Sequence, residues 1–100
     1  MSKLNGAQRK ALRGLAHSMK PALQVGKEGL TEAVISALDD AIRARELIKV
    51  KLAGERDDRQ AMVGVIEARL DCECVGTIGR MAILFRRHPD PDHRVVELPD

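Results

Sequence analysis

The apolar positions of the chain change their spacing several times, and each change predicts a new element. Between residues 4 and 19 apolar side chains recur at steps of three and four, which predicts an amphipathic helix that ends before Pro21. Residues 22–25 are a short apolar run, which predicts a strand. A second helical pattern follows, with Thr31 as the expected N-cap and apolar side chains at positions 30, 33, 34, 37, 38, 41 and 42.

The next segment alternates between apolar and polar residues. In LIKVKL, residues 47–52, Ile48, Val50 and Leu52 point one way, whereas Lys49 and Lys51 share the other face. This pattern predicts a half-buried strand with two lysines on its open face.

A third helix and a hairpin complete the predicted domain. Asp57 or Asp58 is expected to cap a helix whose apolar stripe ends at Leu70. Strands at 72–78 and 81–86 then flank Gly79-Arg80, a two-residue hairpin loop. The order α-β-α-β-α-β-β predicts one compact α/β (α+β) domain over residues 1–88, with a mixed four-stranded sheet. We expect the Pro- and Asp-rich tail, residues 89–100, to be partly mobile, with VVEL at 95–98 as a candidate edge strand.

Charge is distributed unevenly along these 100 residues. The chain as a whole carries +2, but residues 1–29 contain six basic residues against one acidic residue, a net +5. Residues 30–100 contain eleven basic and fourteen acidic residues, a net −3. Such asymmetry is typical of a protein that binds a polyanion. A solvated basic helix would give the same pattern, so charge alone does not decide between the two.

A glycine-bracketed loop precedes the second helix. Gly26 and Gly29 enclose Lys27 and Glu28, and glycine permits both positive φ and close approach of a partner. The helix that follows offers unpaired N–H groups, and Lys27 adds a cation, so the loop suits a phosphate. Ordinary turns also contain two glycines, and Glu28 must point away from any anion. The nucleotide-binding motifs GxGxxG and GxxxxGK[ST] are absent, whereas KH-type RNA clamps use a GxxG loop.

Several short motifs occur together in a recognisable order. They are L-R-x-x-A-H-x-x-K-P at Leu12–Pro21, G-K-x-G-L-T at Gly26–Thr31, E-L-I-K-V-K at Glu46–Lys51, V-G-x-I-G-R at Val75–Arg80 and I-L-F-R at Ile83–Arg86. Together they resemble the CRM domain (chloroplast RNA splicing and ribosome maturation), whose stand-alone bacterial members are the YhbY-like proteins. The resemblance spans roughly residues 4–87. One departure is Phe85, where the family often has tyrosine.

The resemblance implies an RNA-binding domain similar in fold to the C-terminal domain of translation initiation factor three. It also implies association with the precursor of the large ribosomal subunit. By the same resemblance, the RNA-contacting loop consists of Gly26, Lys27, Glu28 and Gly29. Arg13, His17 and Lys20 lie in the motif beside it.

Further basic residues are candidates for an RNA-binding face. They are Lys10 on the first helix, Lys49 and Lys51 on the alternating strand, and Arg80 and Arg86 on the hairpin. Lys49 and Lys51 fit an ordinary solvated sheet face equally well, and His17 could cap its helix instead. Phe85 is the only aromatic residue among Phe, Tyr and Trp, and its apolar strand predicts a core position. Binding is therefore expected to use phosphate, sugar and RNA shape more than base stacking.

Other functional classes find little support in the sequence. Cys72, Cys74, His88 and His93 lack the ligand spacing of zinc sites, and no nucleophile–base set emerges. The two cysteines are expected to be reduced. We therefore expect a cytoplasmic, monomeric, non-enzymatic protein without cofactor, metal, membrane or small-molecule substrate. Its expected partner is ribosomal RNA in a pre-large-subunit particle. The alternative is an adaptor whose basic face meets an acidic protein.

Overall fold

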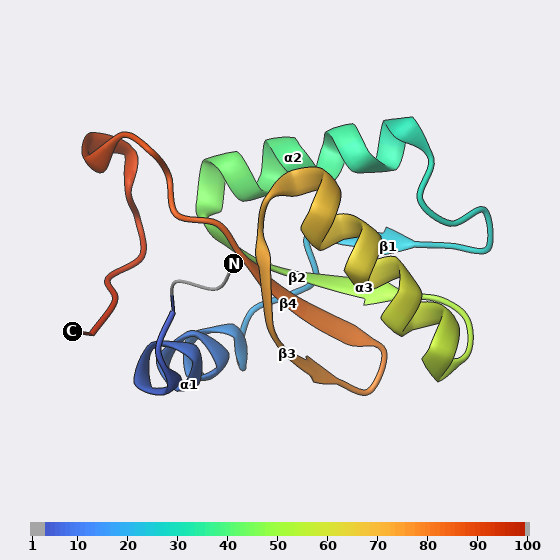
Figure 1. Ribbon diagram of the computed structural model, residues 1–100, viewed down its shortest axis with the longest axis horizontal. Coiled ribbons are helices and arrows are strands. Elements are labelled where there is room, and N and C mark those ends of the chain that lie inside the picture. Colours follow the sequence, from blue (N-terminus) through green and yellow to red (C-terminus); the bar gives the residue numbers. More distant parts are fainter. Residues whose placement is uncertain (1–3, 100) are drawn as a thin grey trace.

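A computed structural model describes residues 4–99 and shows helices packed on both faces of a four-stranded sheet (Figure 1). The strand order is β1-β2-β4-β3, with β1 parallel to β2 and the other pairs antiparallel. This architecture confirms the predicted fold class; residues 1–3 and 100 of the predicted domain and tail lie outside the described residues. The elements are α1 (Gly6–Ala16), β1 (Leu23–Val25), α2 (Glu32–Arg45), β2 (Leu47–Leu52), α3 (Arg56–Leu70), β3 (Glu73–Ile78), β4 (Met81–Phe85) and the short 3₁₀ turn η1 (Pro91–His93).

One face of the sheet packs against α2 and α3. The alternation of β2 sends Ile48, Val50 and Leu52 into this layer, as predicted. In α2 the buried residues are Ile35, Leu38 and Ile42. Ala33 was placed in the predicted stripe but is exposed, because the buried face of α2 is centred on Leu38 and Ile42, which brings Ile35 inward.

The other face of the sheet is covered by α1 and by the C-terminal segment. Leu47, Ile83 and Phe85 form this second core, which also contains Leu12 and Ala16 of α1. Val96 and Leu98 pack onto it from the C-terminus. The predicted core position of Phe85 is confirmed, with 4% of its surface exposed. The two central strands are therefore buried on both faces.

The burial of Lys49 overturns one expectation from the sequence. The face of β2 that carries Lys49 is not open, because α1 covers it, and Lys49 is only 8% exposed. Its ammonium donates hydrogen bonds to the backbone carbonyls of Met19 (2.9 Å) and His17 (3.4 Å). Lys49 thus satisfies the carbonyl of His17, the C-cap of α1, and that of Met19 in the segment that follows the helix. Lys51, two residues further on, is half-buried.

Side-chain caps set the starts of the helices. In α1, Asn5 and Gln8 form a reciprocal capping box, with bonds of 2.8 and 3.0 Å. Thr31 caps α2 as predicted and accepts from the Val34 N–H at 3.2 Å. For α3 the prediction was wrong, since the N-cap is Glu55. Asp58 sits at the third helical position and accepts from the Glu55 N–H at 3.2 Å.

α1 and three of the predicted strands are shorter than expected, whereas β2 has the predicted bounds. α1 ends at Ala16, and the backbone N–H of His17 bonds to Gly14, so His17 occupies the C-cap that the sequence allowed for it. β1 and β3 each begin one residue later than predicted, and β4 ends at Phe85. The hairpin loop is Gly79-Arg80 as predicted, with φ +57° at Gly79. Positive φ at the first loop residue alone is the pattern of a type II′ turn.

The C-terminal segment is held against the domain by one buried carboxylate. Glu46, at the C-terminal end of α2, has no exposed surface and accepts three backbone N–H bonds: from His88 (2.7 Å), Val95 (2.7 Å) and Val96 (2.9 Å). Gln8 adds a side-chain bond to the Pro99 carbonyl at 2.9 Å. The segment after β4 is therefore tied to the domain at a few points, and residues 95–98 form no strand; the N–H groups of Val95 and Val96 bond to the Glu46 side chain instead.

Replacing Glu46 by glutamine tests this anchor. Glutamine offers one acceptor oxygen in place of two, and its NH₂ group would face a backbone donor. We expect the Glu46→Gln protein to lose about 1–3 kcal/mol of unfolding free energy. Amide hydrogen exchange at Val95 and Val96 should become faster. Glu97→Gln removes the same charge at an exposed position of the tail and should change neither quantity; equal behaviour of the two variants would contradict the anchor.

The same carboxylate should contribute to the acid sensitivity of the protein. Burial raises the pKa of Glu46, but the hydrogen bonds from the N–H groups of His88, Val96 and Val95 together lower it by more. The pKa therefore lies below the ordinary value of 4.5. A carboxyl with a lowered folded-state pKa stabilises the protein above its unfolded value and loses that contribution as pH falls through the folded value. Urea unfolding below pH 4.5 should therefore show a loss of stability that is reduced in Glu46→Gln.

Substituting each of the two lysines of β2 tests whether Lys49 stabilises the fold through its hydrogen bonds. Lys49→Met leaves the carbonyls of His17 and Met19 without their donor, and we expect a loss of about 1–3 kcal/mol in urea unfolding. Lys51→Met makes the same chemical change at a half-buried position with no ion pair among the described residues. It should stay within about 0.5 kcal/mol of wild type. A Lys49→Met protein as stable as Lys51→Met would refute the role assigned to Lys49.

Candidate nucleic-acid interface

The GKEG loop is a compact, exposed turn between β1 and α2. The Gly29 N–H bonds to the Gly26 carbonyl at 3.0 Å, which closes the turn and places Lys27 and Glu28 at its tip. Gly26, Lys27 and Glu28 are exposed. Gly29 has φ +75°, a conformation that favours glycine. A Cβ built on either glycine would meet nothing within 4 Å, so the open space around the backbone is available to a partner.

The start of α2 lies directly behind this turn. Thr31 takes the Val34 N–H, and the other N–H groups of the first turn add a partial positive charge. Glu32 would oppose an anion here, but both its oxygens pair with Arg69 of α3, at 2.8 and 3.1 Å. The hydrogen bonds and the positive charge of Arg69 hold the pKa of Glu32 below its ordinary value. The acidic residue nearest the helix start is therefore matched by a cation.

The structure separates the loop from the basic residues of α1. Figure 1 shows the β1–α2 loop at one end of the long axis and α1 under the opposite half of the sheet. Lys10 and Arg13 lie on α1 and are exposed, as are His17 and Lys20 in the segment that follows it. The expectation that the helix motif lies beside the loop is correct in sequence and wrong in space, because the chain from Lys20 crosses the sheet along β1 before it reaches the loop.

Arg13 is fixed by the edge strand β3. Its guanidinium donates to the Val75 carbonyl at 3.0 Å. A Cβ at Gly76 would lie 2.6 Å from Cδ of Arg13, so the glycine makes room for the arginine stem. A break in the β3–β4 register between Cys74 and Gly76 produces this arrangement. Arg13 therefore has a structural role whether or not it also contacts a ligand.

Other cations do gather near the loop. The Ala53 N–H bonds to the Val25 carbonyl (3.0 Å) and the Leu52 N–H to the Arg80 carbonyl (2.8 Å). These bonds bring together the ends of β1 and β2 and the tip of the hairpin. We call this edge, formed by residues 26–29, 51–59 and 79–80, the loop end. Its basic residues are Lys27, Lys51, Arg56, Arg59 and Arg80.

Two of these cations were not among the predicted site residues. Arg56 and Arg59 occupy the first turn of α3, on the same side of the helix as Val63. Their spacing of three residues was a usable signal, since residues three apart share a helix face. Nothing in the sequence indicated that this face meets the hairpin tip at Arg80.

Two predicted RNA-contacting residues serve the interior instead. Lys49 binds the two carbonyls described above. Arg86 donates to Asp39 and to the Leu70 carbonyl, both at 2.8 Å. The hydrogen bond from Arg86 holds the pKa of Asp39 below its ordinary value despite partial burial. Arg86 therefore ties the end of β4 to α2 and α3. The remaining predicted contacts stay predictions.

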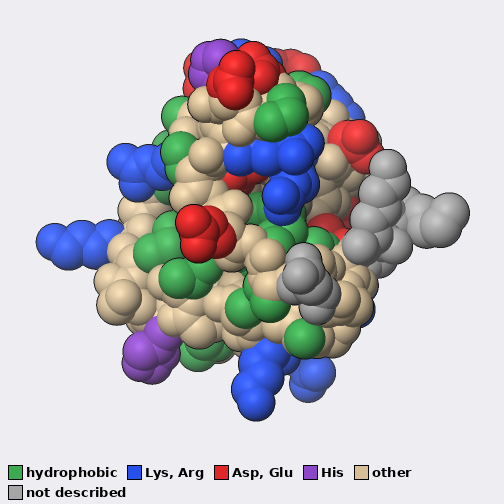
Figure 2. All heavy atoms as spheres, turned by 90° about the vertical axis from the view of Figure 1, so that its left-hand side faces the viewer, with side chains coloured by type: hydrophobic (Ala, Val, Ile, Leu, Met, Phe, Trp, Pro, Cys, Tyr) green, Lys and Arg blue, Asp and Glu red, His purple; other side chains and the backbone are tan. Residues whose placement is uncertain are grey.

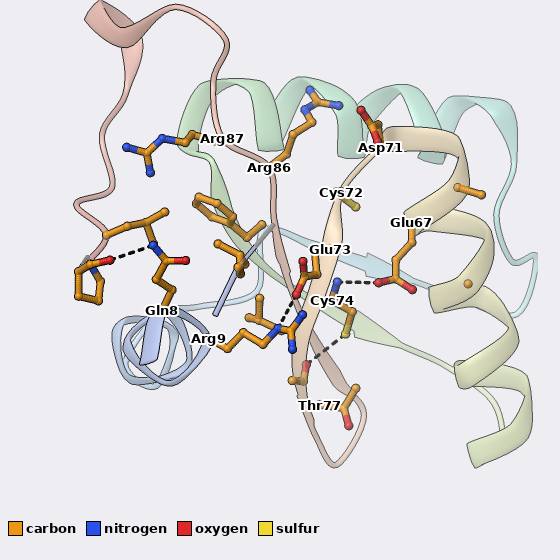
Figure 3. A pocket seen from close by; sticks show the side chains of 18 residues that line it. Gln8, Arg9, Glu67, Asp71, Cys72, Glu73, Cys74, Thr77, Arg86 and Arg87 are labelled. Atoms are coloured by element: carbon orange, nitrogen blue, oxygen red, sulfur yellow. Dashed lines mark hydrogen bonds and ion pairs between the residues drawn. The ribbon is translucent and has the colours of Figure 1, made fainter. Parts of the chain in front are cut away.

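A concavity away from the loop carries charges of both signs. A groove of about 1380 Å³ runs along β3 between α1 and α3 (Figure 3). Its lining includes Glu67, Asp71 and Glu73 as well as Arg9, Arg86 and Arg87, and Arg9 pairs with Glu73 at 2.6 Å. Burial, together with the negative charge of Glu67, raises the pKa of the Cys72 thiol to about 12. Within residues 4–99 no group of three or more His, Cys, Asp or Glu residues is arranged to hold a metal ion.

The end opposite the loop also lacks a basic patch. Figure 2 looks at this end and shows acidic, basic and apolar side chains interspersed. His88 and His93 stack there with ring centroids 5.0 Å apart, and His93 contacts Asp90 at 2.9 Å. Among the described helices, none has both the length and the apolar content that crossing a membrane requires.

Comparison with known proteins agrees with this architecture. Residues 4–86 match the CRS1 / YhbY (CRM) domain. A probable RNA-binding protein of Pseudomonas aeruginosa is 42% identical over 90 residues, which are 89% of this chain and 86% of that protein. An RNA-binding protein of Haemophilus influenzae is 38% identical over 87 residues, 86% of this chain and 88% of its own length.

A solved structure extends the comparison to the fold. The solution structure of a hypothetical protein from Staphylococcus aureus superposes with a TM-score of 0.81 at 35% identity, covering 96% of this chain and 99% of that one. The family match covers most of the chain, and the fold agrees over nearly all of it. The chain therefore belongs to the CRS1 / YhbY (CRM) domain family.

Proposed function

We propose that this protein binds structured ribosomal RNA through its loop end and acts, without catalysis, in assembly of the large ribosomal subunit. The observation that carries the proposal is the exposed glycine-bracketed turn at the start of α2, with Lys27 at its tip. The names of the relatives support RNA as the partner. The ribosomal target rests on the resemblance to the CRM family.

Unpaired charge at the loop end supports binding to a phosphate backbone. Among the described residues, Lys27, Lys51, Arg56, Arg59 and Arg80 have no ion pair with a carboxylate. Four arginines elsewhere do pair with acidic residues, namely Arg9, Arg43, Arg69 and Arg86, whereas Arg13, Arg45, Arg87 and Arg94 have no carboxylate partner within residues 4–99. Cations without an internal partner are the ones that can release counterions from RNA on binding.

The chain offers no exposed aromatic platform for base stacking beyond its histidines. Phe85 lies in the core, and the sequence contains no tryptophan or tyrosine. Affinity should therefore come mainly from phosphate and sugar contacts and should fall steeply as salt rises.

The edge strand supports a monomer as the acting form. β3 is at the edge of the sheet, where unpaired backbone groups invite pairing with a second chain. Here the Glu67 carboxylate accepts a hydrogen bond from the Cys74 N–H at 2.9 Å, and the Arg13 guanidinium donates one to the Val75 carbonyl. Both side chains obstruct strand addition. Cys72 and Cys74 are free thiols, which suits the reducing cytoplasm we propose as the site of action.

Substitutions at the turn test the RNA contact. Lys27→Glu should weaken binding to a structured ribosomal RNA fragment by about tenfold or more, because a charge-assisted contact becomes repulsive. A fluorescence anisotropy titration across salt concentrations measures this, and the slope of log affinity against log salt should become shallower by about one. Arg45→Glu makes a charge reversal at the other end of α2 and should have a much smaller effect.

A matched pair at Gly29 separates charge from backbone geometry. Asn and Asp both tolerate positive φ better than other side chains do, so Gly29→Asn and Gly29→Asp impose a similar backbone cost. Only Gly29→Asp adds negative charge beside Lys27 and should weaken RNA binding further. If Lys27→Glu and Gly29→Asp both bind as wild type does, the turn is not the RNA contact.

Sedimentation tests the ribosomal target and the adaptor alternative together. The wild-type protein should co-sediment with precursors of the large subunit, and ribonuclease treatment should release it. The Lys27→Glu protein should remain in the light fractions. Co-sedimentation that survives complete ribonuclease digestion would favour an adaptor that binds an acidic protein partner.

A further inference from the structure

A second concavity lies at the loop end, between α3 and the β3–β4 hairpin. Its volume is about 380 Å³, which is within the roughly 300–1,000 Å³ of small-molecule sites. Arg56 and Arg59 of α3 line one side, and Arg80 at the hairpin tip lines the other. Three arginines, two from α3 and one from the hairpin loop, therefore line one hollow.

The acidic residues of the α3 start are turned away from this pocket. Successive helix residues are rotated by about 100°, so Arg56 and Arg59 share a face that Asp58 does not. Asp58 instead faces the helix start, where it accepts the Glu55 N–H. No carboxylate lines the pocket among the residues described. Arg59 is oriented by a hydrogen bond from Nη1 to the Gly54 carbonyl at 2.6 Å, which leaves its other N–H groups for a ligand.

The lining of the pocket combines apolar and polar side chains. Val63 of α3 and Met81 of β4 contribute apolar surface, and Gln60 and Thr77 contribute hydrogen-bonding groups. This combination differs from a flat basic surface, which would meet phosphate alone. Unpaired RNA bases are recognised by stacking on guanidinium planes and by hydrogen bonds to their edges.

The pocket is close enough to the GKEG loop for one RNA to reach both. Neighbouring strands are about 4.8 Å apart, so β1 and β4, on either side of β2, are separated by roughly 10 Å. The bonds from Leu52 to Arg80 and from Ala53 to Val25 hold the two features at the same edge. The pocket also opens on the face of the sheet that carries α2, the helix that follows the loop.

We propose that the pocket between Arg56, Arg59 and Arg80 receives one unpaired nucleotide of the bound RNA. This inference rests on the function proposed above and adds a determinant of target choice to it. The base lies against Val63 and Met81, under a guanidinium group, and the arginines hold its phosphate. The protein thereby distinguishes RNA with a bulged or looped nucleotide from a continuous duplex.

Three RNA probes test the proposal in a binding titration of the full chain. The first is a blunt duplex, the second is the same duplex with one unpaired nucleotide, and the third carries an abasic residue at the unpaired position. The third probe keeps the flexible backbone and its phosphate but lacks the base. The wild-type protein should bind the bulged duplex about tenfold more tightly than the abasic one, given the stacking of one base. Each of the four bases is tried at the bulge.

Variants locate the preference within the molecule. Arg56→Ala and Arg80→Ala, both at exposed positions, should reduce the ratio of bulged to abasic affinity to within about twofold. Arg45→Ala, an exposed arginine at the far end of α2, should leave the ratio unchanged. Lys27→Glu should weaken binding of all three probes together and keep the ratio.

The outcomes separate this proposal from the one it rests on. If the wild-type protein binds all three probes equally, or if the pocket variants keep the full preference, the nucleotide pocket is refuted and the RNA-binding function stands. If the wild-type protein binds none of the probes and no ribosomal RNA fragment, both proposals fail.

Discussion

Burial of β2 and β4 on both faces is the constraint that shapes the rest of the molecule. α2 and α3 are needed on one side, and α1 with the C-terminal segment on the other. A strand buried twice must exclude or satisfy its polar side chains. Lys49 is therefore retained only because α1 ends above it and the chain there offers two carbonyls. The same packing leaves the loop end of the sheet uncovered by α1, so its cations remain free for a partner.

Glu46 is a second buried charged residue whose polar atoms are satisfied by backbone groups. It ends α2 with φ +64°, a backbone conformation that is unfavourable for a residue with a side chain. The sharp change of direction brings the chain straight into β2 and points the carboxylate inward, where the three N–H groups of the C-terminal segment meet it. Local strain of about 1–3 kcal/mol is thus offset by bonds from a segment some fifty residues away. The match to the family model ends at residue 86, before that segment, and Val96 and Leu98 of the segment pack onto the core.

In the proposed RNA surface, one feature supplies most of the affinity and another selects the type of RNA. The exposed turn and the surrounding cations suit the repeating phosphates, which carry no sequence information. The arginine-lined pocket suits a single base that has left its stack. Two acidic residues near these features have partners of their own: Glu32 pairs with Arg69, and Asp58 accepts a hydrogen bond from the Glu55 N–H. The loop end holds five basic and four acidic residues, so its net charge is +1.

What the sequence determined by itself is what depends on neighbours along the chain. Periodicity placed the three helices and the alternating strand, Thr31 marked a helix start, and Gly79-Arg80 marked the hairpin loop, because spacing, caps and turns act over a few residues. The family motifs identified the domain. Only the tertiary structure decided that Lys49 and Arg86 face inward, that Glu46 anchors the C-terminal segment, and that Arg56, Arg59 and Arg80 share a pocket away from α1. Each of these depends on which surface covers which, and burial and ion pairing join residues that lie tens of positions apart.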